Sequence, residues 1–199
     1  MDNKRTAVLL IGYQNDYFSA QGILHGALED SSQVGAVLDK TLQLIDKCQQ
    51  ADILLASTPI IFTPDYSELN DPIGILKLIK DNGAFRSGQP GAETIPQLQD
   101  CQDLISLPGK RGLNAFSNTR LAELLREQQI EDVIIAGAVT SLCIDTAGRE
   151  AVDLGFNVTV LSDCTVARTA FEQEYYCNEI MPLYANVRSS QDVIDELGI

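Results

Sequence analysis

The chain has 199 residues, of which 45% are hydrophobic, and it carries a formal net charge of −14. A chain of this length buries about 70% of its unfolded surface, so we expect residues 1–199 to fold as a single domain without disulfides. Such an acidic chain offers no basic surface to a phosphate backbone or an anionic membrane. Composition therefore excludes nucleic acid and membrane surfaces as expected partners.

No apolar run approaches the roughly 18 residues of a membrane span. The first residues lead directly into a short apolar run, without the pattern of a secretory signal. The five cysteines are odd in number and widely spaced, which argues against a secreted disulfide framework and against a zinc knuckle. We therefore expect a cytoplasmic protein.

The first elements alternate between strand and helix. A continuous apolar run over 6–11 is typical of a central parallel strand, and apolar residues at helical spacing predict a helix over 34–48. A second strand is predicted over Ile53 to Phe62, and we expect it to stop or bend near Ser57, because Pro59 cannot donate to a central ladder.

Residues 65–93 are rich in Pro, Gly and Asp and contain one predicted short helix at 73–80. We expect this segment, the excursion, to cover a site or to form an oligomer contact. The alternation then resumes, with strands predicted at 104–107, 133–136 and 158–161 and helices at 119–128, 142–154, 169–183 and 193–197. Parallel strands joined by right-handed helical crossovers form a three-layer α/β/α fold.

Cys143 is the residue that points most directly to chemistry. It follows a buried strand across the turn at 138–142 and opens the helical pattern of 144–154. This places the thiol at or near a helix N-terminus, where unpaired N–H groups and the helix dipole favour a thiolate. The carboxyl ends of parallel strands are also where α/β sheets bind ligands. The alternative is a small, inert core residue.

Three segments in chain order resemble the isochorismatase-like cysteine hydrolases. They are 7–18, which contains Gln14-Asn-Asp16; 110–121, which begins with Lys110-Arg-Gly; and 137–147, which contains Cys143. The resemblance spans nearly the whole chain and implies an isochorismatase-like fold with a six-stranded, mainly parallel sheet.

The resemblance also implies roles for particular residues. Cys143 is the expected nucleophile, and Lys110 is the expected cation that favours its thiolate, although from its position alone Lys110 could be an exposed loop lysine. The oxyanion hole is expected from backbone N–H groups near Val139 and Cys143, with a cis peptide between Ala138 and Val139. The expected substrate pocket consists of Gly12, Tyr13, Phe18, Phe116, Ala138 and Thr140.

One position departs from the family pattern. The first strand of these hydrolases normally ends in an Asp that takes the thiol proton and later delivers it to the leaving amine, and here that position is Gly12. Loss of a general acid/base costs a factor of about 100 to 10,000 in rate. Asp16 is a candidate replacement, although the resemblance implies that it serves hydrogen bonds of its own loop, and strand alternation directs Tyr13 elsewhere. We therefore expect slow amide hydrolysis, faster ester hydrolysis and rescue of amides by Gly12→Asp.

No metal or cofactor is expected. Nicotinamidase-type members bind a divalent ion through an Asp and two His after the second strand, and the corresponding stretch, 58–68, contains no histidine. His25, the one histidine, is expected to be a loop residue at the entrance. Gly88 and Gly91 do not follow a strand and open a helix, as a dinucleotide-binding motif requires. Cys164 is interpreted as a packed thiol.

Two functions remain open from the sequence. The first is a cysteine hydrolase that acts on a small acyl or amide substrate, and the second is a small-molecule-binding or regulatory protein that has lost turnover with its Asp. A homo-oligomer is expected by analogy with the family and from the apolar residues at 73–79.

Overall fold

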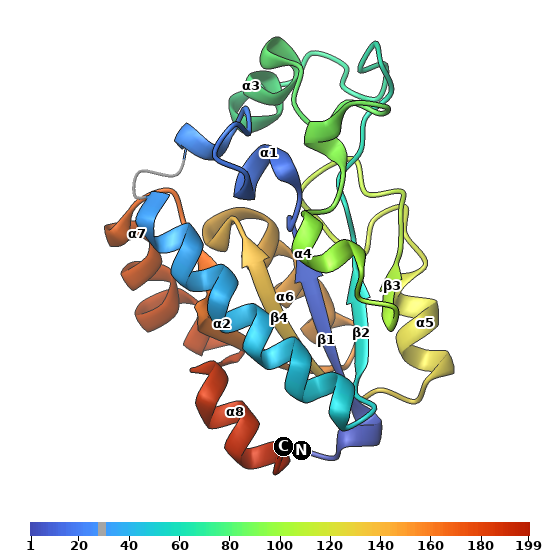
Figure 1. Ribbon diagram of the computed structural model, residues 1–199, viewed down its shortest axis with the longest axis vertical. Helices are drawn as coiled ribbons and strands as arrows, with labels where there is room; N and C mark the ends of the chain where they lie inside the picture. Colours follow the sequence, from blue (N-terminus) through green and yellow to red (C-terminus); the bar gives the residue numbers. More distant parts are fainter. Residues whose placement is uncertain (28–30) are drawn as a thin grey trace.

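The computed structural model describes residues 1–27 and 31–199 (Figure 1). Within these residues, six strands form one parallel sheet in the order β3-β2-β1-β4-β5-β6. The strands are β1 (Thr6–Ile11), β2 (Leu54–Ser57), β3 (Leu104–Ser106), β4 (Asp132–Ala138), β5 (Asn157–Val166) and β6 (Asn186–Arg188). The expected three-layer α/β fold with a six-stranded parallel sheet is confirmed.

The helices connect these strands and cover both faces of the sheet. They are α1 (Asn15–Phe18), α2 (Ser31–Gln50), α3 (Gly74–Asn82), α4 (Pro96–Gln99), α5 (Leu121–Glu127), α6 (Asp145–Asp153), α7 (Ala170–Tyr175) and α8 (Ser190–Leu197). Figure 1 shows α2 on the near face of the sheet, α6 behind it, and α1 and α3 beyond the carboxyl ends of β1 and β4. Among the helices of the described residues, none has both the length and the apolar character needed to cross a bilayer.

Alternating side chains of the central strands divide the core into two layers. Val8 and Leu10 of β1 pack with residues of α2 and α8, whereas Leu9 and Ile11 pack with residues of α5 and α6. All six residues of β1 are buried, as expected for a central strand that is covered on both faces. The apolar run of β1 therefore holds the two helical layers together.

Two predicted helices differ from the observed ones, and one observed strand was not predicted. β6 was not among the strands predicted from periodicity, because its three residues are partly exposed at the sheet edge and form no apolar run. The helix predicted over 169–183 is divided into α7, a π-helical turn (Tyr176–Ile180) and a 3-10 turn (Met181–Leu183) that contains Pro182. The terminal turn predicted at 193–197 is the end of the longer helix α8, which begins at a Ser189–Asp192 capping box.

The carboxyl ends of β1 and β4 approach each other closely at Gly137. Ile11 pairs with Gly137 in the sheet, and a Cβ atom at Gly137 would lie 1.8 Å from the carbonyl oxygen of Ile11. Gly137 also has a φ of 130°, a conformation that favours glycine. The register of β4 against β5 shifts between Ile135 and Gly137. Only glycine fits this point of the sheet.

We therefore expect Gly137→Ala to lower the free energy of unfolding by more than about 4 kcal/mol, because the backbone of β1 must move to admit the methyl group. Gly155→Ala is the matched control: Gly155 has a φ of 93° but nothing within 4 Å of its Cβ position. The control should lose only about 1–2 kcal/mol from backbone strain. Urea unfolding measures both values, and equal losses would contradict the steric explanation.

Candidate functional site

The candidate site lies at the carboxyl ends of β1 and β4. β4 leads into a cis peptide between Ala138 and Val139, at the bond that the family resemblance implies. A π-helical turn over Thr140–Ile144 follows and continues into α6, so Cys143 lies in the first turn after the strand. The Val139 carbonyl closes this turn by accepting hydrogen bonds from the N–H groups of Leu142 and Ile144. The sequence thus positions the thiol at the sheet edge where ligands bind.

Lys110 contacts Cys143. Its Nζ lies 3.3 Å from the Cys143 Sγ, and the two residues are only 1% and 6% exposed. A bridge to Ile60 and a hydrogen bond from the Ile61 N–H to the Lys110 carbonyl hold the lysine backbone. Lys110 is therefore not an exposed loop lysine. A buried ammonium requires a partner, and within the described residues the Cys143 thiol is the only polar group recorded in hydrogen-bond reach of Nζ.

Gly12 adopts a conformation that L side chains rarely take. Its φ is +79°, and a Cβ atom there would lie 2.8 Å from the Ala138 carbonyl oxygen and 3.5 Å from Cδ2 of Tyr17. The backbone of β4 and the ring of Tyr17 therefore close around the position at which the resemblance expects an Asp. This crowding opposes the rescue by Gly12→Asp that we expected from the sequence.

Tyr17 is a site residue that the sequence analysis missed. It lies on α1, is 4% exposed, and its ring packs beside Phe85 with centroids 5.0 Å apart. Burial raises the pKa of Tyr17 well above its usual range, and negative charge on Cys143 and then on Asp16 raises this pKa further. The phenol and the thiol are thus close enough to interact electrostatically, and the phenol stays neutral. The sequence carries no signal for this position, because it depends on a single helical turn of four residues after Gly12.

Asp16 is occupied by backbone hydrogen bonds. Its Oδ1 accepts from the Ile23 N–H at 3.2 Å and its Oδ2 from the Phe85 N–H at 2.6 Å. A Cβ atom at Gly91 would lie 2.3 Å from the same Oδ1, so the excursion packs directly on this carboxylate. These bonds give Asp16 the loop-holding role that the resemblance implies, and they leave it little freedom to act on Cys143.

Gln14 bonds to the chain before the excursion and to the end of the excursion. Its Nε2 donates to the carbonyls of Ile60 and Ala92 at 2.9 and 2.7 Å, and its Oε1 accepts from the Ile60 N–H at 2.9 Å. Phe62 and Arg86 form a second bridge across the excursion. The side chains that follow β1 therefore hold both ends of the segment between Ile60 and Ala92.

The predicted pocket residues occupy different surroundings. Tyr13 and Phe18 stack on each other with ring centroids 4.6 Å apart in the core layer beneath α2, and the Tyr13 hydroxyl bonds to Thr41 and to the Cys164 carbonyl. Phe116 packs in the same core layer as Cys143. The roles of these side chains in a substrate pocket stay predictions.

Other polar groups near the turn are paired within the protein. Thr140 donates to Gln173 at 2.6 Å, and His25 Nδ1 lies 3.0 Å from the Tyr17 carbonyl oxygen. Cys164 is fully buried in the core, as its interpretation as a packed thiol requires. A pocket role for Thr140 and an entrance role for His25 also stay predictions.

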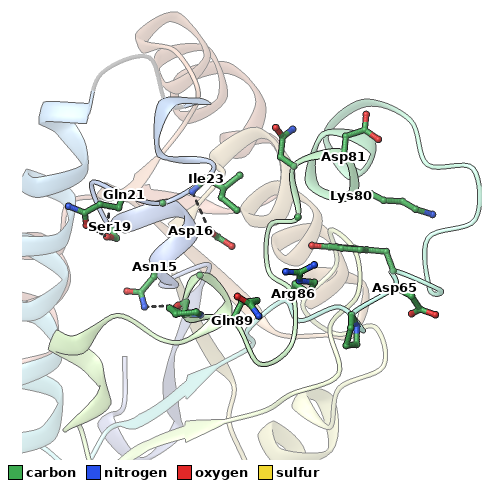
Figure 2. Close-up of a pocket in the computed structure, with 17 residues that line it drawn as sticks. Asn15, Asp16, Ser19, Gln21, Ile23, Asp65, Lys80, Asp81, Arg86 and Gln89 are labelled. Carbon is green, nitrogen blue, oxygen red and sulfur yellow. Dashed lines mark hydrogen bonds between the residues drawn. The ribbon is translucent and has the colours of Figure 1, made fainter.

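A separate open cavity of ≈ 910 Å³ lies between α1, with the turn that follows it, and the excursion. In the close-up of Figure 2, Asp16 stands on the α1 side of this cavity and Arg86, Asp65 and Lys80 belong to the excursion. Lys110 and Cys143 do not line it. The cavity and the thiol–lysine pair are therefore distinct features of this end of the sheet.

The stretch after β2 does not fit the metal site of nicotinamidase-type hydrolases. Asp65 accepts a hydrogen bond from Thr63 Oγ1, and Glu68 accepts from the N–H and hydroxyl of Thr63 and lies 3.5 Å from Arg111. These carboxylates are thus occupied locally, without a histidine beside them. Across residues 1–27 and 31–199, no group of three or more His, Cys, Asp or Glu side chains has an arrangement that could hold a metal ion.

The geometry at Gly12 predicts that Gly12→Asp destabilises the protein. The positive φ costs about 1–2 kcal/mol, and the new Cβ atom would lie 2.8 Å from the Ala138 carbonyl oxygen, so the backbone of β4 must shift. We expect a loss of about 2 kcal/mol or more in urea unfolding and no gain in amide turnover. Gly12→Ala, which shares the strain without the charge, is the control. A stable Gly12→Asp variant with faster amide hydrolysis would contradict this expectation.

Comparison with known proteins agrees with this geometry. The family model of the isochorismatase domain matches residues 6–192. Nicotinamidase 3 of Arabidopsis thaliana is 28% identical over 186 residues, covering 92% of this chain and 82% of that protein. Ureidoacrylate amidohydrolase RutB of Cronobacter sakazakii is 25% identical over 98% of this chain and 89% of its own.

Among solved structures, a cysteine hydrolase from Pseudomonas syringae pv. phaseolicola 1448A superposes with a TM-score of 0.86 at 20% sequence identity, covering 100% of this chain and 94% of its own. At this identity the likeness shows the fold alone. The family match extends from β1 through the first residues of α8 and so includes every element that builds the candidate site. The chain belongs to the isochorismatase family of hydrolases.

Proposed function

We propose that this protein is a cysteine hydrolase that acts on a small amide or activated acyl substrate. The observation that carries the proposal is the buried contact of 3.3 Å between Lys110 Nζ and Cys143 Sγ. An adjacent cation favours the thiolate, which is the reactive form of cysteine. The names of the two curated relatives, a nicotinamidase and a ureidoacrylate amidohydrolase, support substrates with an amide-like bond.

In the proposed reaction, the Cys143 thiolate attacks the carbonyl carbon and forms a thioester, which water then hydrolyses. Backbone N–H groups of Val139 and Cys143 are the proposed donors to the oxyanion, since both residues belong to the turn that carries the thiol. The ammonium of Lys110 stabilises the negative charge on sulfur before attack and after release. No cofactor or metal takes part in this proposal.

Gly12 sets the expected selectivity among substrates. An amine leaves a tetrahedral intermediate poorly unless it is protonated, whereas a thiolate or nitrophenolate departs without a proton. Because position 12 supplies no carboxylate, we expect activated esters and thioesters to react faster than simple carboxamides. The substrate is small in this proposal, because Cys143 is almost completely enclosed.

The alternative is a small-molecule-binding or regulatory protein on the same scaffold. The observation that favours it is the backbone at Gly12, where the positive φ and the distance of 2.8 Å from a Cβ atom to the Ala138 carbonyl oxygen both oppose an Asp at this position. The two functions differ in one measurable property, since only the hydrolase requires a reactive thiol at Cys143.

A cytoplasmic setting and a homo-oligomer complete the proposal. All five cysteines are free, which suits a reducing compartment. Ile73 at the start of α3 is 84% exposed, and Leu78 on the same helix is also exposed, whereas Ile79 is buried. Exposed apolar side chains of this kind favour a contact with a second copy of the chain.

Selective alkylation tests the reactive thiol. Burial raises the pKa of Cys48 and of Cys164 to about 12 and that of Cys177 to about 11, and burial also raises the pKa of Cys101. These four thiols therefore stay protonated near pH 7 and become reactive only at higher pH. We expect iodoacetamide at pH 7 to modify Cys143 first, as measured by mass spectrometry of tryptic peptides.

Lys110→Met should slow this alkylation by about tenfold or more, because the thiolate loses its cation. Lys77→Met removes an exposed lysine that pairs only with Asp81 and serves as the control. Modification of Cys48 at the same rate as Cys143 would remove the premise of an activated thiol.

Turnover tests the nucleophile itself. We expect Cys143→Ala to lower the hydrolysis of p-nitrophenyl acetate and of small carboxamides by about 1,000-fold or more. Cys101→Ala, at a partly buried cysteine outside the site, should leave both rates unchanged. Circular dichroism melting checks that both variants fold. Full activity of the Cys143→Ala variant would end the proposal, and an inactive but alkylatable wild type would favour the binding protein.

A further inference from the structure

The ring of Tyr17 lies beside Gly12. A Cβ atom on Gly12 would lie 3.5 Å from Cδ2 of the tyrosine ring and 2.8 Å from the Ala138 carbonyl oxygen. The same Ala138 begins the turn that carries Cys143. The aromatic ring therefore lies within van der Waals contact of the place where a side chain at position 12 would begin, next to the turn of the proposed nucleophile.

The hydroxyl of Tyr17 differs from those of the other buried tyrosines. Tyr13 bonds to Thr41 and to a backbone carbonyl, and Tyr66 donates to the Ala84 carbonyl at 2.7 Å. For the Tyr17 hydroxyl, no hydrogen bond to another group of the described chain is recorded, although the residue is only 4% exposed. Within the described residues, Thr58 Oγ1 is the only fully buried side-chain N or O atom without a hydrogen-bond partner. The Tyr17 hydroxyl is therefore not sealed in the core, and its O–H is available to a bound molecule.

Charge links this phenol to the thiol. Burial is the largest cause that raises the pKa of Tyr17, and negative charge on Cys143 is the next. While Cys143 is a thiolate, Tyr17 therefore holds its proton firmly and cannot act as a base. Formation of the S–C bond removes the charge on sulfur before the C–N bond breaks, and the contribution of Cys143 to this pKa disappears. The phenol becomes a better acid at the stage when a leaving amine needs a proton.

We propose that the Tyr17 hydroxyl is the proton donor to the leaving group in this protein, at the place where other family members use an Asp. The inference rests on the proposed hydrolase function. In acylation, the S–C bond forms, the C–N bond breaks, and the amine nitrogen takes the phenol proton, which leaves a phenolate and a thioester. In deacylation, water adds its hydroxide to the thioester carbon and gives its proton to the phenolate. The carboxylic acid departs, and the Cys143 thiolate is restored.

A packing role is the competing explanation, because the Tyr17 ring also fills the space beside Gly12 and Phe85. A phenylalanine would fill that space equally well, whereas it could not donate a proton. Tyr17→Phe therefore separates the two roles without opening a cavity.

The experiment compares two substrate classes in purified protein. We expect Tyr17→Phe to lower kcat/KM for a small carboxamide by about 100-fold or more, and to change kcat/KM for p-nitrophenyl acetate by less than about threefold, because nitrophenolate leaves without a proton. Iodoacetamide should modify Cys143 at the wild-type rate, because Lys110 is retained. The melting temperature should hold, since no hydrogen bond within the protein is lost.

Tyr66→Phe is the matched control, because it removes a buried hydroxyl that donates to Ala84 outside the candidate site. It should lower the melting temperature and leave the amide-to-ester ratio unchanged. An unchanged ratio in Tyr17→Phe would overturn the inference, as would a wild type that hydrolyses esters but no amide, and in both cases the hydrolase proposal would survive. A wild type that hydrolyses neither class would overturn both.

Discussion

The ends of β1 and β4 lie so close together that neither Gly137 nor Gly12 has room for a side chain. This steric constraint places the turn after β4 directly against the residues that follow β1. Cys143 is carried by that turn, and Tyr17 by the helical turn on the other side. The close approach of β1 and β4 therefore brings Cys143, Tyr17 and Gly12 to the same end of the sheet.

Gln14 and Asp16, two polar residues after β1, form structural hydrogen bonds, although an acidic side chain at this place could also suggest a catalytic base. Both side chains are buried and bond to backbone groups. Gln14 bonds to Ile60, just before the excursion, and to Ala92 at its end, whereas Asp16 accepts from the Phe85 N–H within it. A carboxylate whose two oxygens both accept backbone hydrogen bonds is held in place as a structural anchor. In the proposed reaction, the chemistry is therefore assigned to Cys143, Lys110 and Tyr17.

Much of the fold was predictable because its strands are strongly apolar and alternate with helical patterns. The contact between Lys110 and Cys143 was expected only from the family resemblance, since 33 residues separate the two in sequence and no local pattern joins them. Tyr17 could not be predicted, because its position depends on the φ of Gly12 and on a helix of only four residues. β6 escaped prediction for a related reason, since three residues at a sheet edge carry no periodic signal.

Two backbone hydrogen bonds close the base of the loop that contains most of the excursion. The Phe62 N–H donates to the Phe85 carbonyl, and the Ser87 N–H donates to the Phe62 carbonyl. Residues 63–84 therefore form a loop whose closing bonds do not depend on its length, and lengthening a surface loop costs little free energy. Insertions and deletions there can reshape the wall of the open cavity while the lysine–thiol contact, which this cavity does not include, stays the same.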